Sequence, residues 1–76
     1  MNKDRRKRIQ SIMEQLSNLQ TEIEEIKEEE QEAYDNLPES LQDGERGEKM
    51  SEAIENLDSA YSSLEEITEC LEEAIQ

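Results

Sequence analysis

Apolar residues recur along the first half of the chain at steps that alternate between three and four. The series comprises Ile9, Ile12, Leu16, Leu19, Ile23, Ile26, Glu30, Ala33 and Leu37, with Glu30 as its only polar member. Such steps return to the same side of an α-helix at every turn, and their alternation is the heptad spacing of a coiled coil. The pattern therefore predicts an amphipathic helix over about residues 3–36.

A second series of the same kind occupies the other half of the chain. It comprises Met50, Ile54, Leu57, Tyr61, Leu64, Thr68, Leu71 and Ile75, with Thr68 as its only polar member. No segment alternates apolar and polar residues in the way a half-buried strand does. We therefore expect a second helix over about residues 45–75 and an all-α fold.

Turn-forming residues separate the two series. Pro38, Gly44 and Gly47 are the only proline and the only glycines of the chain. The residue before a proline disfavours helical backbone angles, so Leu37 should end the first helix. The turn is expected over about residues 37–44, and Asp43 is the best candidate for a side chain that caps the second helix.

A connection this short makes two helices antiparallel neighbours. We therefore predict one domain over residues 1–76, an antiparallel two-helix coiled-coil hairpin, in which facing residue numbers add up to 80. The facing pairs are Ile9/Leu71, Ile12/Thr68, Leu16/Leu64, Leu19/Tyr61, Ile23/Leu57, Ile26/Ile54 and Glu30/Met50, with Ala33 opposite Gly47 near the turn.

A second apolar stripe indicates self-association. Leu and Ile make up 14 of the 76 residues, and Val and Phe are absent, so a lone hairpin buries little apolar surface. The expected oligomer face follows a seven-residue spacing along the second helix and consists of Ala53, Ala60, Ile67 and Ala74. Met13 and Tyr34 add apolar flank to the first helix. We predict a homodimer that forms a four-helix bundle; the alternative is that these alanines serve only as good helix formers.

Charge is unevenly distributed along the chain. Acidic residues number 22 and basic residues 8, a net charge of −14, yet Lys3–Arg8 alone carries +4 and residues 9–76 carry −18. The hairpin register lays Lys3–Arg8 beside Glu65–Glu73, where the opposite charges can offset each other. Direct binding of nucleic acid is not expected, because the acidic remainder repels phosphate and the only aromatic residues are two tyrosines.

Composition also excludes several function classes. The chain has no His and a single Cys, Cys70, so it lacks the commonest general base and cannot form an internal disulfide. No apolar run is long enough to cross a membrane. The glutamates at 24–25 and 28–30 are interpreted as a solvated face rather than a metal site. We expect a non-enzymatic cytoplasmic protein with no cofactor and no metal.

The turn is the least periodic part of the chain and the best candidate for a partner-binding tip. Its candidate residues are Tyr34, Asn36, Glu39, Gln42, Glu45, Arg46 and Glu48. Arg46 is available for an anion or for a carboxylate of a partner. The alternative is that this segment does no more than connect the helices.

The run from Tyr34 to Gln42, followed by Glu45–Met50 and an acidic helix rich in Ala, Ile and Leu, resembles a group of small proteins. These are acidic helical-hairpin proteins encoded by phages and other mobile elements of Gram-positive bacteria. The resemblance implies an accessory protein of the bacterial cytoplasm that is not an enzyme. It carries over no catalytic or ligand-binding residue.

Three functions are compatible with these patterns. In the first, the protein blocks a host defence or DNA-binding protein, its acidic rod occupying a basic groove as a nucleic-acid mimic does. In the second, it is a self-assembling structural or adaptor module. In the third, it is an oligomer that sequesters nucleotides through Arg46 and the basic N-terminal segment.

Overall fold

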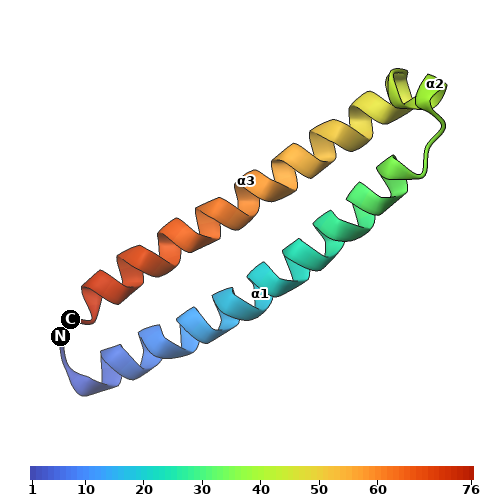
Figure 1. The fold of residues 1–76 in the computed structure, drawn as a ribbon. Helices are drawn as coiled ribbons and strands as arrows, with labels where there is room; N and C mark the ends of the chain where they lie inside the picture. Colours follow the sequence, from blue (N-terminus) through green and yellow to red (C-terminus); the bar gives the residue numbers. More distant parts are fainter.

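In a computed structural model of residues 1–76, the chain folds into three helices and no strand: α1 (Lys3–Asp35), α2 (Glu39–Gln42) and α3 (Glu45–Ala74). The prediction of an all-α fold is confirmed. The two long helices, α1 and α3, lie side by side and run in opposite directions. Both chain ends lie at one end of the molecule and α2 lies at the other (Figure 1).

Local interactions fix both ends of α1. Asn2 precedes the helix with extended backbone angles, and its Oδ1 accepts a hydrogen bond of 2.9 Å from the Arg5 N–H, which satisfies one of the free donors of the first turn. At the other end, the Asn36 N–H still donates to the Glu32 carbonyl at 3.0 Å. Pro38 follows two residues later and precedes α2.

The start of α3 corrects one expectation. Gly44, not Asp43, is the residue before the helix, and no side chain caps it. Asp43 ends α2 with φ −83° and ψ −6°, whereas a residue that caps a helix N-terminus needs an extended backbone. Gly44 has that conformation, with φ −89° and ψ −175°.

Gly47 is where the turn packs most closely. It is the one buried residue of the chain, and a Cβ added there would lie 2.0 Å from the Gln42 carbonyl oxygen. Glycine is therefore required by the approach of α2 to α3. The expectation that Ala33 lies opposite Gly47 is wrong, because Gln42 occupies that place and Ala33 is exposed.

The inner face of α3, which is the side turned towards α1, matches the predicted series. All eight of its members are half-buried: Met50, Ile54, Leu57, Tyr61, Leu64, Thr68, Leu71 and Ile75. Between them, Ala53 is also half-buried, while most other positions of α3 are exposed. The spacing of apolar residues therefore identifies the side of α3 that packs.

The inner face of α1 differs from the prediction. It consists of Ile9, Met13, Leu16, Gln20, Ile23, Lys27, Glu30 and Tyr34, all half-buried. Ile12, Leu19 and Ile26, which were expected inside, are 45%, 48% and 52% exposed. The helix is turned so that Met13 and Tyr34 pack inwards and the polar groups of Gln20 and Lys27 reach acceptors on α3.

The molecule is a rod without a buried core. No hydrophobic side chain is buried, and the extents of the Cα atoms are 58 × 15 × 12 Å. The radius of gyration is 17.3 Å, compared with about 11 Å for a compact domain of this length. The helices therefore shield each other along only one side each.

Candidate interaction surfaces

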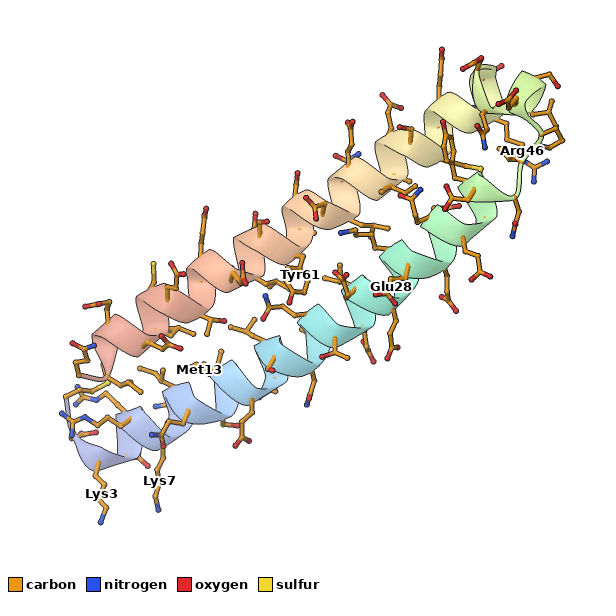
Figure 2. The ribbon with its side chains drawn as sticks, in the orientation of Figure 1. Lys3, Lys7, Met13, Glu28, Arg46 and Tyr61 are labelled. Atoms are coloured by element: carbon orange, nitrogen blue, oxygen red, sulfur yellow. The ribbon has the colours of Figure 1, made fainter.

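Polar contacts between α1 and α3 fix how the two helices are rotated. The Lys27 ammonium lies 2.9 Å from Asp58 Oδ1 and 3.9 Å from a Glu24 oxygen, and the Gln20 amide donates to the Tyr61 carbonyl at 3.3 Å. Met13 and Tyr61 lie between the two helices (Figure 2). The contact from Gln20 to Tyr61 also shows which parts of α1 and α3 are at the same height along the rod.

Lys27 is held in its charged form. Its side chain is 25% exposed, and the hydrogen bond to Asp58 raises its pKa above the ordinary value of 10.5. The charges of Asp58, Glu24 and Glu28 act in the same direction, and desolvation opposes them. The inner face of α1 thus contains a cation at all physiological pH values.

An exposed apolar stripe runs along each long helix, and the two stripes lie on the same side of the rod. Adjacent residues are about 100° apart around a helix. Because Lys27 reaches Asp58 along one edge of the contact between the helices, Ile26 lies on the opposite edge. Ala60 is two residues from Asp58, or about 200° around α3, which places it on the edge of Ile26.

We call these two stripes together the apolar face. It consists of Ile12, Leu19, Ile26 and Ala33 from α1 and Ala53, Ala60, Ile67 and Ala74 from α3. Ile67 is 47% exposed; Ala60 and Ala74 are also exposed, and Ala53 is half-buried. Sequence analysis identified the α3 stripe but missed the α1 stripe. Met13 and Tyr34, each one position after Ile12 and Ala33, belong to an alternative heptad series, but the sequence of α1 alone does not decide between the two series.

Carboxylates are the most numerous charged groups on the remaining surface, and few of them are paired. Only Glu24, Glu45 and Asp58, of 22 acidic residues, lie within 4.0 Å of a cation. Residues 20–63, which we call the turn half, contain 15 acidic and 3 basic residues, a net charge of −12. The terminal half, residues 1–19 and 64–76, contains 7 acidic and 5 basic residues, a net charge of −2. The rod therefore has one strongly acidic end.

The basic segment Lys3–Arg8 does not pair with α3. None of its five cations lies within 4.0 Å of a carboxylate, and the Lys3 and Lys7 side chains point away from α3 (Figure 2). The expected offset against Glu65–Glu73 is therefore not realised as ion pairs. Exposed ion pairs between long side chains contribute only about 0–1 kcal/mol. This is too little to hold the cations of Lys3–Arg8 against the carboxylates of α3.

Three of the candidate residues at the turn, Tyr34, Asn36 and Gln42, take part in contacts within the turn itself. The Gln42 amide donates to the carbonyls of Tyr34 at 3.0 Å and Leu37 at 3.1 Å, and Asn36 ends α1. Tyr34 is half-buried. These contacts explain the shape of the segment without a partner.

The other candidate residues at the turn are exposed: Glu39, Glu45, Arg46 and Glu48. Arg46 forms no ion pair and lies at the turn end of the rod (Figure 2). It shares an open hollow with Glu45 and Lys49 that has no hydrophobic lining. Contact of these residues with a partner stays a prediction.

Three observations concern metal binding, the cysteine and membrane insertion. No group of three or more Cys, Asp or Glu side chains is arranged to hold a metal ion. Cys70 is exposed and lines a hollow with Glu66, Glu69, Glu72 and Glu73. Neither long helix contains a stretch apolar enough to cross a bilayer. The surfaces on which the functional proposal is based are the apolar face, the carboxylates and the turn.

Comparison of the chain with protein-family models, with curated proteins and with solved structures gives no match. Functional inference therefore rests on the surfaces described above.

Proposed function

We propose that the chain is a non-enzymatic binding protein: a helical hairpin that pairs with a second copy and offers its acidic surface to a basic surface of a protein partner. The observation that carries this proposal is that 19 of the 22 carboxylates have no cation within 4.0 Å. Unpaired carboxylates on a narrow scaffold attract a basic surface and steer its approach.

The charge density supports competition with nucleic acid for the same groove. A net charge of −14 over a rod 58 Å long is about one charge per 4 Å, close to the ~3.4 Å per charge of a single DNA strand. The partner we propose is therefore a DNA-binding protein or nuclease whose basic groove accepts the rod in place of DNA.

The resemblance of the turn and of α3 to proteins of phages and mobile elements supports a setting for this activity. In that setting the protein acts in the cytoplasm of a bacterial host, and its target is a host defence or DNA-binding protein. In the proposed contact, the carboxylates along the rod supply general charge attraction. The exposed turn contributes contacts of defined shape through Glu39, Glu45, Arg46 and Glu48.

A displacement assay tests the proposal. The chain is titrated into complexes of a fluorescent DNA duplex with purified basic DNA-binding proteins and nucleases from a Gram-positive bacterium. We expect displacement from at least one of them. The dissociation constant of the chain for that protein, measured directly without DNA, should rise about tenfold or more when salt increases from about 50 to 300 mM. Displacement from none, or a directly measured dissociation constant that salt leaves unchanged, would contradict the proposal.

Matched charge variants sharpen this assay. One variant replaces Glu25, Glu28 and Glu32 of the turn half with Gln, and the other replaces Glu65, Glu69 and Glu72 of the terminal half. All six residues are exposed and none forms an ion pair. The first variant should weaken displacement more than the second, because the turn half carries most of the net charge. Equal weakening would argue against contact through the turn half.

A second function, that of a self-assembling structural module, is favoured by a separate observation: no hydrophobic side chain of the single chain is buried. In this function the carboxylates act only as solubilising groups. A chain that self-associates yet displaces DNA from no basic protein would support the module over the inhibitor. Sedimentation velocity showing only monomer at about 100 μM would contradict the function as a self-assembling module.

A further inference from the structure

We infer that two copies of the chain pair through their apolar faces with the rods antiparallel, about a twofold axis that passes beside Leu19 of α1 and between Ala60 and Ile67 of α3. This inference rests on the pairing part of the proposed function and assigns its face, direction and register. The product is a four-helix bundle in which α1 packs on α1 of the second copy and α3 on its α3.

The positions of the two stripes favour this axis. Leu19 is the central member of the three large residues of the α1 stripe, Ile12, Leu19 and Ile26, with the small Ala33 left outside this count, and the centre of the α3 stripe lies between Ala60 and Ile67. The hydrogen bond from Gln20 to Tyr61 places both centres within about one helical turn of the same height along the rod. A twofold rotation of the rod about this axis therefore places the α1 stripe against the α1 stripe of the second copy and the α3 stripe against its α3 stripe. An isologous interface requires such a match of each surface with itself.

The packing in this register is complementary in size. On α1, Leu19 meets Leu19 of the second copy, and Ile12 meets its Ile26. On α3, Ala60 meets Ile67 of the second copy, so a small side chain faces a large one. Beside the α3 stripe, the outward neighbours Asn56, Ser63 and Cys70 carry no carboxylate that would oppose the approach.

Charge decides between antiparallel and parallel rods. Parallel pairing would place two turn halves of net charge −12 against each other, whereas antiparallel pairing places each against a terminal half of net charge −2. It also brings the basic segment Lys3–Arg8, which has no ion pair within its own chain, beside residues 30–35 of the second copy. In this register Arg8 lies next to Glu29 of the second copy.

The exposed area leaves room for such an interface. The chain exposes 5839 Å², about 1,000 Å² more than expected for a compact monomer of this mass. A stable pair of proteins buries about 800 Å² on each partner. Covering one side of the rod therefore suits a second copy with the same long, narrow face.

Directional cross-linking tests this arrangement. In a Cys70→Ser background, the variants Ile12→Cys and Ile26→Cys are oxidised separately and as a mixture, after circular dichroism has verified that each is helical. We expect disulfide-linked dimers mainly in the mixture, because position 12 faces position 26 of the other copy. Leu19→Cys should cross-link alone, and Ser17→Cys, on the opposite edge of α1, should not.

The other outcomes are informative in different ways. Efficient cross-linking of Ile12→Cys alone and of Ile26→Cys alone would establish parallel rods and overturn this inference while leaving the pairing itself intact. Cross-linking of Ser17→Cys, with none through position 19, would establish a different face. A strict monomer at about 100 μM by sedimentation would overturn both this inference and the pairing part of the proposed function.

A charge-reversal cycle gives an independent readout without new cysteines. Arg8→Glu and Glu29→Arg should each raise the dissociation constant of the dimer about fivefold or more, because each reversal affects two symmetric contacts. The double variant should recover most of the loss. Additive losses in the double variant would contradict the antiparallel register, and Lys3→Glu with Glu25→Arg, placed outside the contact, serves as the control cycle.

Discussion

The two long helices use their apolar residues differently. On α3, the predicted apolar series is the inner face, from Met50 to Ile75. On α1, the inner face includes Gln20, Lys27 and Glu30, while Ile12, Leu19 and Ile26 remain outside. The difference shows that α3 places most of its large apolar residues against α1, whereas α1 leaves three of its own exposed.

The polar groups on the inner face of α1 are not left without partners. Gln20 reaches the Tyr61 carbonyl and Lys27 reaches Asp58, and no side-chain nitrogen or oxygen is buried without a hydrogen bond. Satisfied polar groups at a half-exposed contact cost little. The rotation of α1 is thus tolerated within the chain, and it frees three large apolar side chains for contact elsewhere.

The largest expected effect comes from disturbing the turn that sets the two helices against each other. Gly47→Ala places a Cβ 2.0 Å from the Gln42 carbonyl oxygen, so the backbone must shift, and we expect a loss of about 1–3 kcal/mol in the free energy of unfolding. Thermal and urea unfolding measure it. Gly44→Ala is the control, because its Cβ would lie 3.5 Å from the nearest atom; equal losses at both sites would contradict this account of the turn.

The next effect separates the two uses of apolar residues. Leu57→Ala, on the inner face of α3, should destabilise the chain by about 1–2 kcal/mol at any protein concentration. A Leu→Ala substitution at a fully buried position costs about 2–5 kcal/mol, and the Leu57 side chain is half-buried. Leu19→Ala should act mainly through association, so its loss should grow with protein concentration. Unfolding measured at about 5 and 200 μM protein distinguishes the two variants. If the losses of stability in Leu57→Ala and Leu19→Ala depended on protein concentration in the same way, the two residues would not have the different roles described here.

A smaller effect is expected at the turn. Gln42→Ala removes two hydrogen bonds to the carbonyls of Tyr34 and Leu37 and should lower the free energy of unfolding by about 1 kcal/mol. Gln31→Ala is a suitable control, because its amide contacts only exposed Asp35. A loss at Gln42 no greater than at Gln31 would show that the turn does not depend on this amide.

The smallest effect concerns Lys27 and depends on pH. Because its folded-state pKa is raised by Asp58 above 10.5, its stabilising contribution is fully present below that value and is lost as pH rises through the raised pKa. The difference in melting temperature between the wild type and Lys27→Met should stay constant from pH 7 to 9 and shrink at higher pH. A difference that already declines between pH 7 and 9 would be inconsistent with this shift.

Sequence patterning identified the two long helices because they follow local rules, but it did not identify α2, which lies inside the predicted turn. The seven-residue spacing located both long helices, and the proline and glycines located the break. Asp43 was assigned the wrong role because α2 ends on it, and the tight approach of α2 to Gly47 depends on packing that composition does not encode. Local signals thus located the elements better than the contacts at the turn.

The rotation of α1 could not be predicted because two readings of its heptad share the positions of Ile9, Leu16 and Ile23. Apolarity alone favours adding Ile12, Leu19 and Ile26. The choice instead follows hydrogen-bond acceptors on α3, at Tyr61 and Asp58, which no pattern within α1 contains. The same reason explains why half of the apolar face was missed: the α3 stripe is visible in one helix, whereas the α1 stripe becomes visible only once its inner face is known.

Isotope-filtered NMR of a mixed sample, half of it ¹³C-labelled and half unlabelled, tests the orientation of α1 most directly. We predict contacts within one chain between the methyl groups of Met13 and Thr68, and contacts only between chains from the Ile12 methyl groups to those of Ile26. Contacts within a single chain from Ile12 to Thr68 and from Leu19 to Tyr61 would contradict the outward placement of the α1 stripe and the pairing built on it.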